Sequence, residues 1–352
     1  MNSIKSAVWG WFKQKAIPEE SLAHALSLAC DGSENQPSQL QWRTLTELLL
    51  TWGAALLIGA GLVFFIAANW QNMGRFERFA LLESSLVIVV AIYILLRYRA
   101  WKNGDRLGFG YTSANAALLA VSIIIGSLLA LVGQTYQTGA DPWQLFALWA
   151  LFALPIAWLA GSELLWLLQA LLLNLTVVLY YQTFPSLFGS LFLFELALGP
   201  LFILNLLLHL GSLLLSGKLG CLAGNRSLNK RFDAPILQQL TIAISVLCIT
   251  LLAVEAIFDE QSRYWLVVYF GLFATGYWLY NFALKQIFVL AIGGFSLVAV
   301  FNSLLTRLMF ETSEPVGLFL VLGLTIIGST TWLTIWLRSR HQIFQDEGAH
   351  ND

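Results

Sequence analysis

Acidic side chains within apolar stretches are the residues of this sequence best suited to chemistry. Glu83, Glu195 and Glu255 each lie in or beside a long hydrophobic run. A charge in lipid is unfavourable, so such carboxylates bind protons or cations, or pair with a nearby cation. We expect all three in the outer leaflet, as a cluster that faces an outward-opening cavity. The alternative is that each pairs with an outer arginine or reaches the membrane surface.

Amides and one histidine lie near the expected middle of two apolar runs. Gln169 and Asn174 belong to one run, and Asn205 and His209 to the next. Asn205 and His209 are four residues apart, which places them on one face of a helix. An intramembrane histidine can relay protons, but hydrogen bonding between helices is the role that we expect for this group.

A second polar group is predicted at the outer membrane surface. It combines the end of the first apolar run with the short polar loop after the third. Both runs cross in the same direction, so their ends should emerge on one face. Amides, a phenol and a carboxylate there could line a shallow pocket for carbonyls, hydroxyls or a sugar. The six candidate residues are Asn69, Trp70, Gln134, Tyr136, Gln137 and Asp141.

Each of these residues also has a purely structural interpretation. Asp141 precedes Pro142, as expected for an N-cap residue followed by proline at the first helical position. Asn69 can end a helix, and Gln134 and Gln137 can satisfy backbone groups of the loop. The sequence leaves both interpretations open.

The elements that position these residues are transmembrane helices. Hydrophobic residues make up 58% of the 352-residue chain and charged residues only 11%, far below the charged share of soluble domains. About 20 apolar residues span a bilayer. The predicted fold is therefore an all-α polytopic bundle of ten spans. They cover residues 46–69, 78–97, 112–132, 143–160, 163–181, 199–216, 238–257, 263–281, 284–304 and 315–337.

Residues 185–198 are apolar but too short for a clear span, and Gly199-Pro200 is expected to end them. This stretch could be re-entrant, interfacial or a span. An eleventh span would reverse the orientation of every later loop, so we leave it out of the count.

The predicted domain organisation has three parts. Residues 1–44 form a short cytoplasmic helical hairpin with a linker, residues 45–340 the transmembrane bundle, and residues 341–352 a cytoplasmic polar tail. Small residues at Ala55, Gly59 and Gly293-Gly294 are expected to allow close helix contacts.

The distribution of basic residues predicts the orientation in the membrane. With the N-terminus in the cytoplasm, fifteen of the nineteen Lys and Arg residues lie on the inner side. Cytoplasmic loops are enriched in Lys and Arg, so both termini are expected in the cytoplasm. The four outer residues are Arg75, Arg78, Arg263 and Arg307.

Several function classes are disfavoured by the sequence. It has no H-E-x-x-H, G-x-S-x-G, P-loop or G-x-G-x-x-G motif, so we expect no catalytic residues, metal site or cofactor. A net charge of −1 makes a nucleic-acid partner improbable. The three cysteines are scattered and should remain free thiols.

Two polar-aromatic runs resemble the signatures of a known family. The first is Gly59–Trp70 (GAGLVFFIAANW), and the second is Gly133–Phe146 (GQTYQTGADPWQLF) followed by Leu148-Trp149. They resemble a bacterial family catalogued as domain of unknown function 2157, and the resemblance is best over residues 1–180. It implies a multi-spanning protein and assigns no activity, and we expect this chain in the bacterial inner membrane.

Three functions are consistent with these features. The first is a binding or assembly component with a polar outward-facing pocket, which works with other membrane proteins or binds a small solute. The second is a transporter or a lipid-handling protein that uses the outer-leaflet carboxylates. The third is an intramembrane enzyme, which the missing motifs disfavour.

Overall fold

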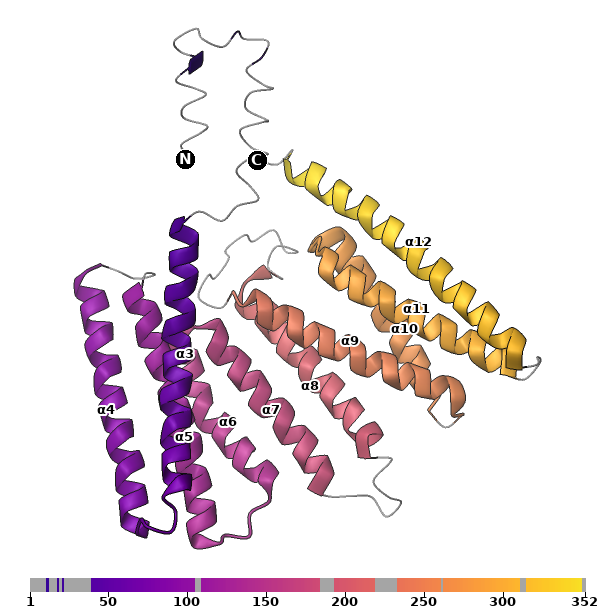
Figure 1. Ribbon diagram of the computed structural model, residues 1–352. Coiled ribbons are helices and arrows are strands. Elements are labelled where there is room, and N and C mark those ends of the chain that lie inside the picture. The colour runs from indigo at the N-terminus through magenta and orange to yellow at the C-terminus, as the bar shows by residue number, and fades with distance from the viewer. Residues whose placement is uncertain are drawn as a thin grey trace.

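The computed structural model describes residues 11, 12, 18, 21, 39–104, 109–183, 193–218, 233–260, 262–310 and 315–349. Over these residues the chain is a bundle of helices (Figure 1). Most of the predicted N-terminal hairpin lies outside the described residues. The helices are α3 (Gln39–Ala68), α4 (Arg75–Lys102), α5 (Phe109–Tyr136), α6 (Pro142–Ala160), α7 (Glu163–Thr183), α8 (Leu193–Leu215), α9 (Pro235–Phe258), α10 (Tyr264–Trp278), the π-helix η3 (Leu279–Ala283), α11 (Ile287–Phe310) and α12 (Pro315–Ala349).

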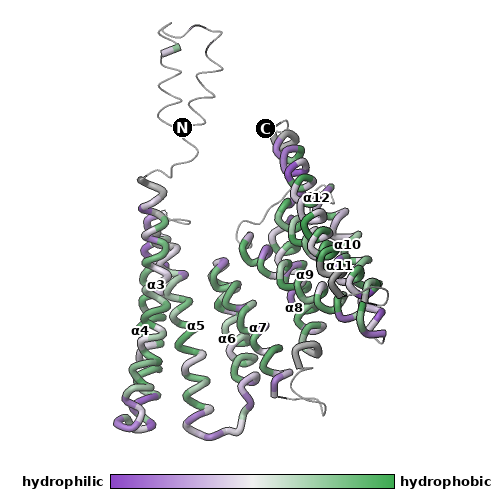
Figure 2. The backbone as a smooth tube through the Cα atoms, turned by 45° about the vertical axis from the view of Figure 1, so that its right-hand side comes forward, coloured by the Kyte–Doolittle hydropathy of each residue, from purple (hydrophilic) through white to green (hydrophobic). Residues whose placement is uncertain are grey.

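Ten helical segments in the described part of the chain are long and apolar enough to cross a membrane, which confirms the predicted fold class. Figure 2 shows hydrophobic residues along the helices and hydrophilic residues mainly toward their ends. α10 and η3 together form the eighth span. The helices extend beyond the predicted spans at one end or both, and the largest extensions are in α3 and α12. α3 begins at Gln39, and α12 continues through residues 341–349 of the predicted tail.

The sixth span differs from the prediction at its start. α8 begins at Leu193 and passes through Gly199 and Pro200 without a break. Residues 193–198 are therefore part of the same helix as this span, and the expectation that Gly199-Pro200 ends that stretch is wrong. Proline removes one backbone donor, and transmembrane helices tolerate this because neighbouring groups satisfy the freed carbonyl. Residues 185–192 lie outside the described residues.

The helices pack largely in chain order. α5 is the central helix of the N-terminal half and contacts α3, α4 and α6, whereas α9 is the central helix of the C-terminal half and contacts α8, α10 and α11. α7 joins the halves by packing on α6 and α8. α4 and α12 lie at the two edges of the bundle (Figure 1) and are the least buried spans described.

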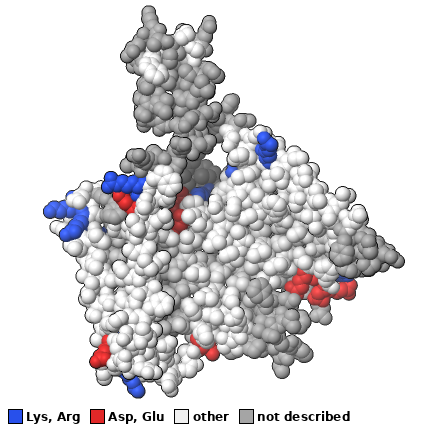
Figure 3. All heavy atoms as spheres, in the orientation of Figure 1, with Lys and Arg blue, Asp and Glu red and all other residues white. Residues whose placement is uncertain are grey.

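The two ends of the bundle differ in charge. Because successive spans alternate in direction, the start of α3 and the end of α12 lie at the same end (Figure 1), which we call the terminal end. Most of the Lys and Arg side chains visible in Figure 3 lie there. Eight described basic residues belong to this end: Arg43, Arg97, Arg99, Lys102, Lys218, Lys285, Arg338 and Arg340.

A carboxylate at the terminal end connects α7 with α9. Glu163, the first residue of α7, accepts hydrogen bonds through Oε1 from the backbone N–H groups of Ile236 at 2.5 Å and Leu237 at 3.3 Å. These N–H groups belong to the first turn of α9, where no intrahelical acceptor exists. Glu163 thus acts as an N-cap that comes from another helix, and its carboxylate interacts favourably with the positive end of the α9 dipole.

Replacing Glu163 with alanine is expected to lower the free energy of unfolding by about 1 kcal/mol, the usual effect of losing an N-cap acceptor. Reversible unfolding in mixed detergent and SDS micelles measures this change. Glu163→Gln keeps an acceptor oxygen, so its free energy of unfolding should fall by less than that of the alanine variant. An alanine variant as stable as the unmodified protein would contradict the cap.

Candidate functional site

The C-terminal ends of α3 and α5 are connected through the start of α4. Arg78 donates a hydrogen bond from Nη2 to the carbonyl of Trp70, and its guanidinium stacks 3.7 Å from the centre of the Trp70 ring. The next residue, Phe79, lies 6.1 Å from Tyr136, measured between ring centres. Both ends therefore lie on the same face of the bundle, opposite the terminal end (Figure 1).

At this end of the bundle, one amide is bonded within its own helix and three of the candidate side chains are exposed. Asn69 donates from Nδ2 to the Phe65 carbonyl at 2.9 Å and so closes its own helix. Gln134, Tyr136 and Gln137 are all exposed. None of the six candidate residues of the outer pocket lines either of the two cavities described below.

Asp141 occupies the N-cap position of α6, with Pro142 as the first helical residue, but its side chain makes no capping hydrogen bond. The start of α6 is instead held by an aromatic contact. Trp143 meets Tyr180 of α7 edge to face, with 5.2 Å between ring centres. The half-buried side chain of Asp141 therefore lies at the end of the bundle opposite the terminal end and forms no cap.

The structure does not bring the predicted carboxylates together as one group. Glu83 is exposed on α4, at one edge of the bundle. Glu255 is half-buried on α9, in the other half. The side chain of Glu195, in the first turn of α8, is outside the described residues. Glu83 therefore faces the surroundings of the bundle and not a cavity shared with Glu255.

The intramembrane amides form hydrogen bonds between helices, as the sequence predicts. Asn205 of α8 is fully buried and donates to Oδ1 of Asn174 on α7 at 2.6 Å. Asn174 donates back to Oδ1 of Asn205 at 3.2 Å. Gln169 donates to the carbonyl of Ala150 on α6 at 3.0 Å. These bonds connect α6, α7 and α8 inside the apolar bundle.

His209, 1% exposed, connects α8 with two other helices. Its Nδ1 lies 2.9 Å from the carbonyl of Gln238 on α9, and its Nε2 is hydrogen-bonded to the hydroxyl of Tyr280 in η3. A carbonyl only accepts, so Nδ1 carries the hydrogen. In the neutral ring Nε2 then accepts from Tyr280. The π-helix brings this tyrosine to the histidine.

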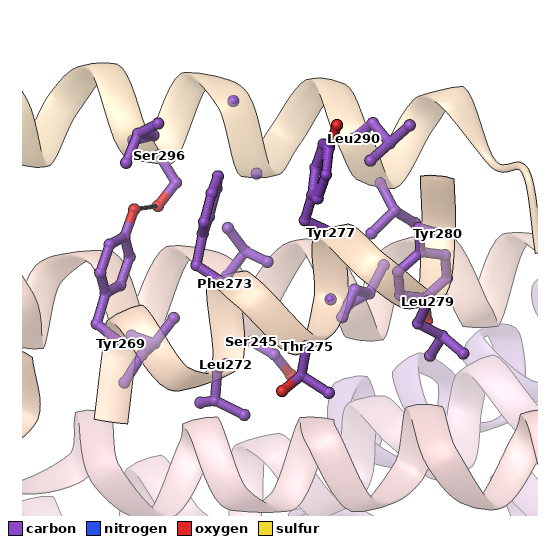
Figure 4. A pocket seen from close by; sticks show the side chains of 18 of the residues that line it. Ser245, Tyr269, Leu272, Phe273, Thr275, Tyr277, Leu279, Tyr280, Leu290 and Ser296 are labelled. Carbon is purple, nitrogen blue, oxygen red and sulfur yellow. Dashed lines mark hydrogen bonds between the residues drawn. The ribbon is translucent and has the colours of Figure 1, made fainter. Parts of the chain in front are cut away.

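A cavity of about 540 Å³ lies between α8, α9, α10, η3, α11 and α12 (Figure 4). This volume is in the range of sites for small molecules. The lining is almost wholly apolar and contains no Lys, Arg, Asp or Glu. One face of α10 and η3, with Tyr269, Phe273, Gly276 and Tyr280, forms much of the wall. A second cavity of about 130 Å³ lies between α7, α8 and α9.

Hydroxyl groups border the large cavity. Figure 4 shows Tyr269 bonded to Ser296 at one end and Tyr280 at the other. The Tyr269 and Ser296 oxygens are 2.8 Å apart, and Ser296 also pairs with Thr250 at 2.6 Å. Ser245 lines the cavity and is 2% exposed, and its hydroxyl has no hydrogen-bond partner in the described structure. Turning the Ser245 side chain would offer this hydroxyl to an occupant.

The cavity is open at the side of the bundle. Of its lining residues, Thr275 on α10 and Trp332 on α12 are exposed, and the others are buried or half-buried. Both belong to membrane-spanning segments. The opening therefore faces the hydrocarbon of the bilayer. Nearer the terminal end, the ring centres of Tyr277 and Trp336 are 6.2 Å apart. This aromatic contact connects α10 with α12 beside the opening.

The described lining of this cavity offers apolar surface and a few hydroxyl groups. His209 and Tyr280 are already bonded to each other, and the lining carries no carboxylate or amine. Among the residues that the structure describes, no three His, Cys, Asp or Glu side chains are grouped to hold a metal ion.

Comparison with known families supports the resemblance seen in the sequence. Residues 10–166 match the family described as Predicted membrane protein (DUF2157). Neither a curated protein nor a solved structure matches the chain. The DUF2157 match includes α3 to α6 and the first residues of α7.

The DUF2157 match and the cavity occupy different parts of the chain. All six residues of the predicted outer pocket lie within the match, whereas the cavity is formed by α8 to α12, beyond its last residue. The outer loop is therefore a feature of the DUF2157 region. The cavity belongs to the C-terminal half of this chain.

Of the candidate functional residues predicted from the sequence, His209 lines this cavity, and Gly293 and Gly294 of the lining were predicted only as helix-packing residues. The signal that could have found more is the spacing of Tyr269, Phe273, Gly276 and Tyr280, which repeats on one helical face. These residues lie in a span that is apolar all round, so their pattern did not stand out from the lipid-facing positions.

Proposed function

We propose that this chain is a membrane protein that binds an apolar or amphiphilic molecule in the cavity between α8 and α12. The observation that supports this function is the cavity itself, with about 540 Å³ of space, an uncharged lining and an opening at bilayer depth. Sites with such volumes and mainly hydrophobic walls are typical of small-molecule binding. The unpartnered hydroxyl of Ser245 would supply a polar contact.

The proposed orientation places the terminal end in the cytoplasm. Eight of the twelve described Lys and Arg residues belong to that end, and cytoplasmic segments are enriched in basic residues. The resemblance to a bacterial family favours the inner membrane. In this orientation Tyr280 and Trp336 lie in the inner leaflet.

Transport along a polar path has less support. Such a path would bring Glu83 and His209, or Glu83 and Asn205, to a common cavity. Glu83 is instead exposed on α4, while His209 lines the cavity and Asn205 is bonded to Asn174. Neither Glu83 nor Glu255, the two described carboxylates on which the transport hypothesis depended, lines this cavity.

Filling the cavity tests the proposed function. Gly276 lines the cavity, and a Cβ built on it would meet no atom within 4 Å. Gly276→Leu is therefore expected to occupy the space without disturbing the helices. We expect amphiphiles that co-purify with the protein, counted by native mass spectrometry, to fall at least about tenfold, which corresponds to about 1.4 kcal/mol of binding free energy.

Gly271→Leu is the matched control. Gly271 lies on the same helix, has no atom within 4 Å of a built Cβ, and is exposed. It is not part of the cavity lining. This variant should keep its bound molecules. Equal occupancy in the Gly276→Leu and Gly271→Leu variants would rule out binding in the cavity.

A further inference from the structure

A charged group lies beside the terminal end of the cavity. Trp336 lines the cavity, and the guanidinium carbon of Arg340, one turn further along α12, lies 5.7 Å from the centre of its ring. Arg340 is half-buried. Lys285 follows η3 at the same end, directly after Leu284, which packs in the same apolar cluster as Trp336. Cations thus lie beside the terminal end of a cavity whose own lining is uncharged.

The cavity is also elongated along α10 and η3. Tyr269 and Tyr280 mark the two ends of its wall and are eleven residues apart, which is three helical turns and about 16 Å. One leaflet of a bilayer has about 15 Å of hydrocarbon. The apolar wall is therefore about as long as one acyl chain, and it is centred near the middle of the eighth span, Tyr264–Ala283.

Together these features indicate what the cavity binds. We propose that its occupant is an anionic phospholipid, with one acyl chain in the cavity and its phosphate at Arg340. This inference rests on the proposed function and specifies the ligand class. An acyl chain makes apolar contacts with the cavity walls. It enters from the side, past Thr275 and Trp332. The phosphate remains at the membrane surface. Basic sites between transmembrane helices are suited to anionic headgroups.

Charge complementarity distinguishes this occupant from an uncharged one. A neutral chain would gain nothing from Arg340, whereas a phosphate accepts from a guanidinium in two parallel hydrogen bonds. Trp336 holds the guanidinium by a cation–π contact and leaves its N–H groups for a headgroup. Arg340 carries the proposal because its one contact described here is with a ring face.

Photo-crosslinking of full-length protein in nanodiscs tests this assignment. The probes are phosphatidylglycerol and phosphatidylcholine with the same diazirine-bearing acyl chain, and mass spectrometry maps the labelled residues. We expect labelling of the cavity walls on α10, α11 and α12, with phosphatidylglycerol preferred. Free inorganic phosphate should not compete, since the acyl chain contributes most of the binding.

Arg340→Gln should lower the preference for phosphatidylglycerol about fivefold, the effect of one cation near an anionic surface. Arg338→Gln is the matched control, because Arg338 is exposed two residues away on the same helix. It should keep the preference. Circular dichroism and size-exclusion profiles verify that both variants are folded.

The outcomes separate the two proposals. Cavity labelling that is equal for both lipids, or that both arginine variants change equally, would overturn the anionic headgroup site while binding in the cavity stands. Labelling of the cavity by neither lipid, together with unchanged occupancy in Gly276→Leu, would overturn the proposed function itself.

Discussion

Replacing His209 with leucine is expected to lower the free energy of unfolding by about 1–3 kcal/mol. The hydroxyl of Tyr280, which is 4% exposed, would lose its acceptor, and a buried polar group without a partner has a penalty of this size. The contact between α8 and η3 would weaken at the same time. Reversible unfolding in mixed detergent and SDS micelles gives the measurement.

A double-mutant cycle separates this hydrogen bond from packing. Tyr280→Phe alone removes the hydroxyl and leaves Nε2 of His209 without a donor. The variant that combines His209→Leu with Tyr280→Phe leaves no hydroxyl without a partner. Its decrease in the free energy of unfolding should therefore be smaller than the sum of the decreases in the two single variants. Strict additivity would show that His209 and Tyr280 do not interact.

Replacing Gly126 with valine is expected to destabilise the N-terminal half by about 1–3 kcal/mol, the usual effect of overpacking. A Cβ built on Gly126 would overlap the indole ring of Trp149 on α6. An indole ring is rigid, and this one is also 3.4 Å from the Ser122 hydroxyl through Nε1. Relief of the clash would separate α5 from α6. The same unfolding assay measures the loss.

Gly61→Val is the control for Gly126→Val. Gly61 lies within the span of α3, is exposed, and has no atom within 4 Å of a built Cβ. The same substitution there should leave stability almost unchanged. If both valine variants unfold alike, helix propensity and not the contact with Trp149 explains the effect.

Small residues show how far sequence patterns predict helix contacts. Gly59 does pack closely, since a Cβ there would lie 2.7 Å from Ile123 of α5, and Gly294 is likewise covered by Leu333 of α12. Gly53 and Gly61, near Gly59 in the same span, have nothing within 4 Å. Gly126, which makes the contact with Trp149, is not distinguished in the sequence. The sequence identifies small residues that could allow close helix contacts, but only the tertiary packing shows which of them do.

The sequence by itself determined the number and the approximate position of the spans, because about 20 consecutive apolar residues must cross a bilayer as a helix. It also predicted that Asn205 and His209 would bond between helices, since an unpaired polar group in hydrocarbon is unfavourable. Both features depend on local composition and on a solvent that offers no hydrogen bonds.

Only the tertiary structure decided which helices are neighbours. It separated Glu83 from Glu255, joined α8 to η3 through Tyr280, and left a cavity beside Gly276. The physical reason is that lipid is as apolar as the protein interior. A transmembrane helix therefore carries no hydrophobic stripe that marks its buried face, and its sequence does not show which side packs, which faces lipid and which borders a cavity.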